Sequence, residues 1–132
     1  KQLVLAGKAP ANSEIVVMGI TFKEDCPDVR NSKVYDIIKR LAEYGVQVTV
    51  VDPWASAEEV EEAYGVRLVA LDAVNNADCL IFAVAHEVFR ELSDRDVEKL
   101  FSSKTSSKII IDVKSIFCER KMKQKGFVYW NL

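Results

Sequence analysis

The sequence predicts an α/β fold: a doubly wound, mainly parallel sheet with helices on both faces. Short, continuously apolar runs such as Ile15–Met18 and Cys79–Ala85 are typical of strands that are buried on both sides. Stretches with helical apolar spacing alternate with these runs, as they do in parallel sheets. The 132 residues, 49% of them hydrophobic, are enough to build one core. We therefore expect a single domain over residues 14–132.

The first half of this domain is expected to hold two strands, each followed by a helix. The first strand is Glu14–Gly19, and an apolar stripe then predicts a helix over Lys33–Tyr44 that ends at Gly45. The second strand is Val46–Val51, and a capping-box pattern opens the next helix over Ser56–Tyr64. The order strand, helix, strand, helix is that of a parallel unit.

The second half continues this alternation. Its expected elements, in chain order, are a short strand at Arg67–Val69, a brief helix at Ala70–Asn76, a buried strand at Cys79–Ala85, a helix from Ser93 to Phe101, a serine-rich loop at Ser102–Ser107, a buried strand at Lys108–Val113, a basic helix at Ser115–Lys125 and an edge strand at Phe127–Trp130. Residues 1–13 instead have the pattern of the end of an earlier helix plus a linker, since Gly7 and Pro10 break them.

Composition argues against several classes of protein. No apolar run approaches the roughly 20 residues that span a bilayer, and no signal peptide opens the chain, so no membrane partner is expected. Three scattered cysteines lack metal or disulfide spacing, which favours the cytoplasm. Basic residues are not interleaved with aromatic ones, so no nucleic acid is expected as a partner. Because the chain opens on Lys1, we expect it to be a piece of a longer protein.

Charge is unevenly distributed along the chain. Residues 1–103 hold 11 basic and 18 acidic side chains, whereas residues 104–132 hold 7 basic and 2 acidic ones. The basic end is either a solvated helix face or a patch that faces an anion or another subunit.

The loop after the first strand is the main candidate site. In an open α/β sheet, ligands bind at the carboxyl ends of the strands, and the helix that follows adds free backbone N–H groups. This loop carries Lys23 and Arg30, two cations that together predict an anion such as a phosphate. The alternative for Arg30 is a simple ion pair with a nearby carboxylate such as Asp28. The chemistry predicted here is binding, with no catalytic residue on this chain.

The glycines, at positions 7, 19, 45, 65 and 126, form no Gly-x-Gly-x-x-Gly pattern. The predicted fold is therefore Rossmann-like but lacks the dinucleotide fingerprint, and no cofactor is expected on this chain. Asp52 ends the second strand, where such domains hold a ribose. Without the glycine loop, Asp52 and Pro53 favour a turn.

Three further side chains are of types that often have functional roles. Cys26 lies near Asp25 and Asp28, which disfavour a thiolate, so we expect an inert thiol. His86, the only histidine, is expected to have a structural or polar-rim role. Lys114, at the end of a late strand, is a second and weaker anion candidate. No metal site is expected.

Two segments of the loop resemble a known family. Gly19–Lys23 reads Gly-Ile-Thr-Phe-Lys and Asp28–Ser32 reads Asp-Val-Arg-Asn-Ser. They are similar to the Gly-Leu-x-Phe-Lys and Asp-x-Arg-x-Ser patterns of the C-terminal domain of the UDP-glucose/GDP-mannose dehydrogenase family. Ala83–His86 fits as well, and the resemblance covers nearly all of the chain from Glu14 onward. Cys26–Asp28 and Asp112–Lys114 look like the branch that oxidises UDP-N-acetylhexosamines.

The resemblance implies a nucleotide-sugar-binding domain of a larger enzyme. It implies that Phe22 and Lys23 contact a UDP-sugar, Lys23 on its phosphates, that Arg30 orders the loop or the substrate pocket, and that Lys114 replaces a substrate-binding arginine. It also implies NAD on a separate N-terminal domain, a dimer or larger assembly, and a catalytic cysteine in a Gly-Phe-Gly-Gly-x-Cys context that this chain lacks. The substrate would be UDP-N-acetylglucosamine or UDP-N-acetylgalactosamine, oxidised to a uronic acid for surface polysaccharides.

Two alternatives remain open at this point. A receiver-like signalling module needs clustered acids at the end of the first strand, where this chain has Gly19–Thr21. A structural or assembly domain would instead pair Lys23 and Arg30 internally and bind no nucleotide.

Overall fold

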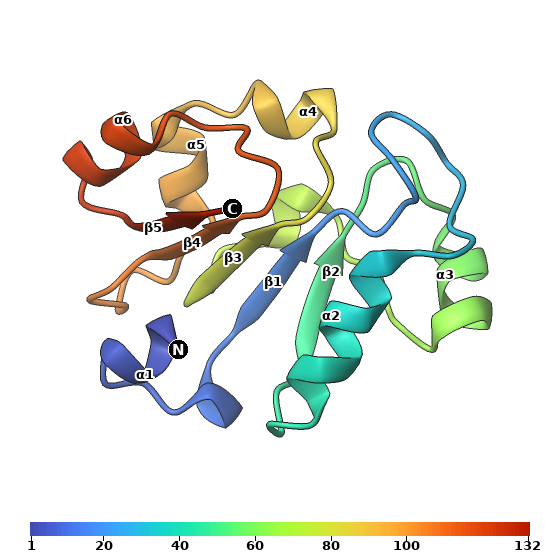
Figure 1. The fold of residues 1–132 in the computed structure, drawn as a ribbon, viewed down its shortest axis with the longest axis horizontal. Helices are drawn as coiled ribbons and strands as arrows, with labels where there is room; N and C mark the ends of the chain where they lie inside the picture. The colour runs from blue at the N-terminus through green and yellow to red at the C-terminus, as the bar shows by residue number, and fades with distance from the viewer.

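The computed structural model describes all residues from Lys1 to Leu132, and every neighbouring pair of strands in its one sheet is parallel. The strands are β1 (Ile15–Met18), β2 (Val48–Val51), β3 (Cys79–Phe82), β4 (Ile109–Asp112) and β5 (Val128–Asn131). Their order is β2-β1-β3-β4-β5, so the direction of winding reverses between β1 and β3. The predicted doubly wound parallel fold is confirmed (Figure 1).

Short helices connect the strands. They are α1 (Gln2–Leu5), η1 (Pro10–Asn12), α2 (Lys33–Ala42), α3 (Ala57–Tyr64), η2 (Leu71–Ala73), α4 (Glu87–Arg90), α5 (Asp94–Lys99) and α6 (Glu119–Gln124), where η marks a 3₁₀ helix. Figure 1 places α4 and the long loop after β1 beyond the arrowheads of the strands, at their carboxyl ends. None of the helices combines the length and apolar character that crossing a membrane requires.

Alternate residues of each central strand enter two separate cores. In β1, Ile15 and Val17 join a cluster with Val34 and Ile38 of α2, on one face of the sheet. The other face buries Val16 and Met18 of β1 with residues of α4, α5 and α6, namely Phe89, Val97 and Met122. Burial on both sides explains why the central strands are apolar at every position.

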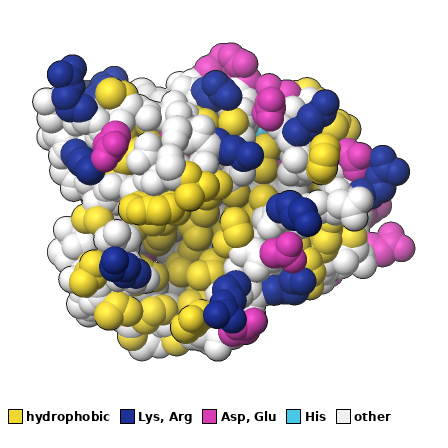
Figure 2. Space-filling model, viewed as in Figure 1, with side chains coloured by type: hydrophobic (Ala, Val, Ile, Leu, Met, Phe, Trp, Pro, Cys, Tyr) yellow, Lys and Arg dark blue, Asp and Glu magenta, His cyan; other side chains and the backbone are white.

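One face of the sheet is less completely covered than the other. Over β3, β4 and β5 it carries a hollow of about 440 Å³, lined in part by Ile81, Ile111 and Trp130. Figure 2 shows hydrophobic side chains gathered in this hollow at the middle of the view.

Residues 1–13 form α1 and η1, and the Lys8 ammonium lies 2.6 Å from the Asp78 carboxylate. The domain boundary after Ser13 stays a prediction.

Three elements differ between the prediction and the structure. The strand expected at Arg67–Val69 is reduced to one parallel bridge between Leu68 and Val50. If this bridge is counted, the strand order is that of dinucleotide-binding domains. The brief helix at Ala70–Asn76 is the 3₁₀ turn η2, and one helical turn, α4, was not predicted.

Two predicted element ends also differ from the structure, one because of hydrogen bonds and the other because of the backbone conformation. β3 ends at Phe82 because the carbonyl of Met18, the last residue of β1, accepts the N–H groups of both Ala83 and Val84, at 3.0 and 3.3 Å, so the regular ladder stops there. The helix expected from Ser115 begins only at Glu119, since Ser115 has a left-handed φ of 52°.

Candidate functional site

The candidate site lies where the winding of the sheet reverses, between β1 and β3. The loop over residues 19–32 leaves the carboxyl end of β1 there, next to residues 83–86 that follow β3. Gly19 starts the loop with a φ of 99°, and an added Cβ would lie 2.5 Å from the Cβ of Val84. Its N–H also donates to the carbonyl of Val51 at 2.7 Å. Only glycine fits this junction of three strands.

Asp52, at the end of β2, connects its own turn to this loop. Its Oδ2 accepts the backbone N–H groups of Ile20 and Thr21 at 2.7 and 3.1 Å. Its Oδ1 accepts those of Trp54 and Ala55 at 2.9 and 3.2 Å, which is the predicted turn. Both oxygens are therefore engaged inside the protein, and the ribose-binding alternative has no free acceptor at this residue.

The charge of the Asp52 carboxylate is stabilised despite its burial. Burial alone raises the pKa of Asp52, but hydrogen bonds from His86 and from the N–H groups of Ile20 and Trp54 outweigh it. The pKa therefore lies below its usual value.

His86 is fully buried and completes this network. Its Nε2 lies 3.0 Å from Asp52 Oδ2 and 3.3 Å from Thr21 Oγ1. Its Nδ1 accepts the backbone N–H of Asp25 at 2.9 Å, and Asp25 Oδ1 in turn accepts the N–H of Glu87 at 3.0 Å. Of the two roles expected for His86, the structural one fits, whereas a place on the polar rim is wrong because the ring has no exposed surface.

Phe22 and Lys23 lie between two fixed points of the loop, Thr21 bound by Asp52 and Asp25 bound by His86. The backbone of Phe22 donates to the carbonyl of Asp28 at 2.8 Å, and Thr21 Oγ1 donates to the carbonyl of Lys23 at 3.0 Å. Both residues are nevertheless open to solvent: Phe22 is 62% exposed, and Lys23 is exposed and in no ion pair. The protein thus presents a free ammonium on a fixed backbone.

Arg30 lies at the far end of the same loop, in acidic surroundings. Its guanidinium makes two hydrogen bonds to Asp28, at 3.0 and 2.8 Å, and this pairing lowers the pKa of Asp28 to about 2. Arg30 and Asp28 line a hollow of about 490 Å³ together with Glu59 and Glu62 of α3. The carboxylate pairing weighed as the alternative for Arg30 is therefore present, although an exposed pair of this kind contributes little stability.

Lys114 lies two strands away, beyond the end of β4. It is exposed and forms no ion pair. Nearby, the buried Asp112 Oδ2 accepts from the N–H of Phe117 at 3.0 Å and from the hydroxyl of Tyr129 at 2.6 Å. Burial, and then the bond to Asp112, raise the pKa of Tyr129. Lys114 and Lys23 share an edge of the sheet without sharing a loop.

The three cysteines are free thiols in different environments. Cys26 is half-buried, Cys118 is exposed, and burial raises the pKa of Cys79 to about 12. No three or more His, Cys, Asp or Glu side chains converge in a way that would hold a metal ion. The carboxyl edge of the sheet instead carries the exposed cations Lys23 and Lys114 and the exposed ring of Phe22. Such groups can bind an anion or a ring.

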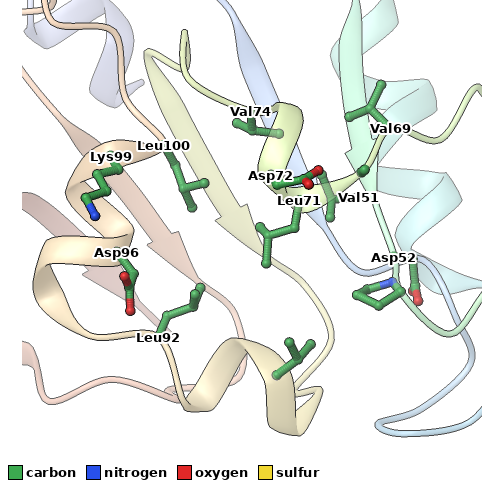
Figure 3. Close-up of a pocket in the computed structure, with 13 residues that line it drawn as sticks. Val51, Asp52, Val69, Leu71, Asp72, Val74, Leu92, Asp96, Lys99 and Leu100 are labelled. Atoms are coloured by element: carbon green, nitrogen blue, oxygen red, sulfur yellow. The ribbon is translucent and has the colours of Figure 1, made fainter.

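A neighbouring pocket of about 680 Å³ was not predicted from the sequence (Figure 3). It lies beside the end of β2, and its walls come from β2, η2 and the segment over α4 and α5, with Val51, Leu71 and Leu100 among its apolar residues. Asp96 also lines it, but its carboxylate accepts from Ser93 at the start of α5. Three segments that are separated along the chain build the pocket, so no local sequence pattern predicts it.

Comparisons with known proteins agree with the sequence patterns. Residues 16–119 match the family model described as "UDP-glucose/GDP-mannose dehydrogenase family, UDP binding domain". The chain is 40% identical over 109 residues to a UDP-N-acetyl-D-glucosamine 6-dehydrogenase of Pseudomonas aeruginosa, with 83% of this chain and 25% of that protein covered. It is 31% identical over 115 residues to a UDP-N-acetyl-D-mannosamine dehydrogenase of Methanococcus vannielii, with 86% and 25% covered.

A similar solved structure is that of an NDP-N-acetyl-D-galactosaminuronic acid dehydrogenase from Methanosarcina mazei Go1. It superposes with a TM-score of 0.79 and 25% identity, over 98% of this chain and 26% of that one. The chain spans about a quarter of the length of the curated relatives it matches.

Proposed function

Because this chain belongs to the UDP-glucose/GDP-mannose dehydrogenase family, as its UDP-binding domain, we propose that the loop after β1 binds the diphosphate of a UDP-sugar. The observation that carries the proposal is Lys23, an unpaired, exposed ammonium on a backbone fixed at the reversal point of the sheet. A charge-assisted hydrogen bond from such a group is worth about 1.5–3 kcal/mol.

The other predicted site residues, Phe22, Arg30 and Lys114, have different roles in this proposal. The exposed Phe22 ring contacts the nucleotide sugar next to Lys23. Arg30 orders the end of the loop through its two bonds to Asp28, and this ordering is its main role because the guanidinium is already paired. Lys114 supplies a second, more distant cation.

The parent enzyme is proposed to be an NAD-dependent UDP-N-acetylhexosamine 6-dehydrogenase, a dimer or larger assembly of the cytoplasm. Its substrate would be UDP-N-acetylglucosamine or UDP-N-acetylgalactosamine, and its uronic acid product would enter surface polysaccharides. The 40% identity to a UDP-N-acetyl-D-glucosamine 6-dehydrogenase supports this substrate class. This chain alone, about a quarter of such an enzyme, would be inactive.

The residues of this chain do not fit NAD. A single glycine, Gly19, stands after β1, and the oxygens of Asp52 accept hydrogen bonds from within the protein. We therefore assign NAD to another part of the parent enzyme.

Titration of the labelled chain with UDP, followed by backbone amide shifts, tests the binding proposal. We expect shifts centred on Thr21–Arg30, and a Kd that rises about tenfold in Lys23→Ala. Lys125→Ala removes the same charge from an exposed site after α6 and is the matched control. Absence of shifts at millimolar UDP, or equal losses in both variants, would contradict the proposal.

A structural or assembly domain without nucleotide binding is the second candidate. The internal pair of Arg30 and Asp28 favours it, because one of the two predicted loop cations is already neutralised. Indifference of UDP binding to Lys23→Ala would support this candidate.

A further inference from the structure

We propose that His86 is a positioning residue, whose ring holds the backbone over Thr21–Asp25 in the conformation that presents Phe22 and Lys23. The inference rests on the proposed function for the identity of the ligand. The geometry is independent of that function, because the hydrogen bonds of the ring define it.

The hydrogen bonds around the ring fix its tautomer. Nδ1 accepts the backbone N–H of Asp25 and therefore carries no proton. Nε2 carries the proton and faces the Asp52 carboxylate at 3.0 Å. The Nδ1 side of the ring thus holds the loop directly, and the Nε2 side is held by Asp52, which follows β2.

The position held by Nδ1 is a demanding one. Asp25 has a left-handed φ of 51°, a conformation that aspartate tolerates better than most residues but does not prefer. Its N–H is bound by His86, and its own carboxylate accepts the N–H of Glu87 at 3.0 Å. Asp25 lies two residues beyond Lys23, and these two bonds anchor it to the segment after β3.

The start of the loop is anchored independently. Asp52 accepts the N–H groups of Ile20 and Thr21, and Thr21 Oγ1 donates to the carbonyl of Lys23. Phe22 and Lys23 are therefore the residues between two anchors, and His86 supplies the second one. His86 has no exposed surface and acts on the ligand only through the loop.

Two substitutions separate the two edges of the ring. The side-chain amide of His86→Asn reaches the place of Nδ1 and can still accept from Asp25, but it loses the contact with Asp52. The amide of His86→Gln reaches the place of Nε2 and can still donate to Asp52, but it leaves the Asp25 N–H without an acceptor. Each variant removes one buried hydrogen bond. The bond lost in His86→Asn is made to a carboxylate, so this variant should lose at least as much stability as His86→Gln.

The experiment measures UDP affinity and amide exchange in the whole 132-residue chain. We expect the UDP Kd of His86→Gln to rise about fivefold and that of His86→Asn to rise less than about twofold, since one neutral hydrogen bond to the loop separates them. The Asp25 amide should exchange at least about tenfold faster in His86→Gln than in His86→Asn. Long-range ¹H–¹⁵N correlation should show the Nε2-protonated tautomer in the unsubstituted chain.

The control is Val97→Ala, which removes buried volume from α5 on the other face of the sheet, outside the loop. It should lower the urea midpoint without a selective change at Asp25. Kd increases that are equal in the two variants, or larger in His86→Asn, would overturn the proposal, as would an Nδ1-protonated ring. If the unsubstituted chain binds no UDP, the proposed function fails. The Asp25 exchange difference then decides on positioning by itself: its presence supports the proposal and its absence overturns it.

Discussion

Asp52 and Asp112 occupy equivalent places, at the carboxyl ends of β2 and β4, and both are buried. Asp52 accepts hydrogen bonds from four backbone N–H groups and faces His86. Asp112 accepts from one N–H and one hydroxyl, and its Oδ1 has no partner. The first carboxylate reaches across to the loop after a neighbouring strand. The second binds only its own loop and the edge strand β5.

This difference explains how the two loops present their lysines. The loop that carries Lys23 is held from outside, by Asp52 at its start and by His86 at Asp25. The loop that carries Lys114 is held by one buried side chain, Asp112 at Phe117, and by an exposed, longer hydrogen bond of 3.4 Å from the Asn131 amide to Ser115 Oγ. A ligand contact is stronger when the group that makes it is already in place. We therefore expect Lys23 to contribute more to binding than Lys114.

The largest expected effect is the loss of the Asp52 carboxylate. Asp52→Ala should lower the free energy of unfolding by about 3–5 kcal/mol, because it leaves several buried N–H groups and His86 without their acceptor. Urea unfolding at neutral pH measures the effect.

The matching change at β4 should cost far less. In Asp112→Asn the amide nitrogen can take the place of the unpartnered Oδ1, while its oxygen still accepts from Phe117 and Tyr129. We expect a loss of about 1 kcal/mol or less. Equal losses at the two positions would remove the distinction between the two carboxylates.

Gly19→Ala tests the junction where the Asp52-held loop begins. The added Cβ would meet the Val84 Cβ at 2.5 Å, and the φ of 99° is strained for any other residue. We expect a loss of about 2–3 kcal/mol of stability in thermal or urea unfolding. Gly65→Ala, which also has a left-handed φ but nothing within 4 Å, is the control for the backbone strain alone. It should lose less than Gly19→Ala.

The pH dependence of stability tests the same carboxylate without removing its side chain. The folded pKa of Asp52 lies below its unfolded value near 4, so its contribution is complete above about pH 5 and is lost as the pH falls through the folded pKa. Between about pH 5 and pH 2, the free energy of unfolding should therefore fall more steeply in the unsubstituted chain than in Asp52→Asn. Parallel profiles would mean that Asp52 is not the group responsible.

The smallest expected effect is that of Lys114 on binding. Lys114→Ala should raise the Kd for UDP by about twofold, against about tenfold for Lys23→Ala, because one buried side chain holds its loop and two, Asp52 and His86, hold the loop of Lys23. Amide-shift titrations of the two variants side by side measure the ratio. A larger effect at Lys114 would reverse the comparison.

The sequence by itself determined the fold class and the place of the main candidate loop. Runs such as Ile15–Met18 are apolar at every position because both faces of the strand are covered, and that pattern is local. The cap at Ser56, the end at Gly65 and the lysine after β1 are likewise readable from neighbours in the chain. The family patterns around Phe22 and Lys23 are also continuous in sequence.

Only the tertiary structure decided which partners hold that loop. His86 lies 61 positions from Asp25 and 34 from Asp52, and all three meet because β1 pairs in register with both β2 and β3. The reduction of Arg67–Val69 to one bridge and the pocket beside β2 likewise depend on contacts between distant segments. Helical and strand periodicity report which face of an element is buried, but they carry no information on which side chain of another element it meets.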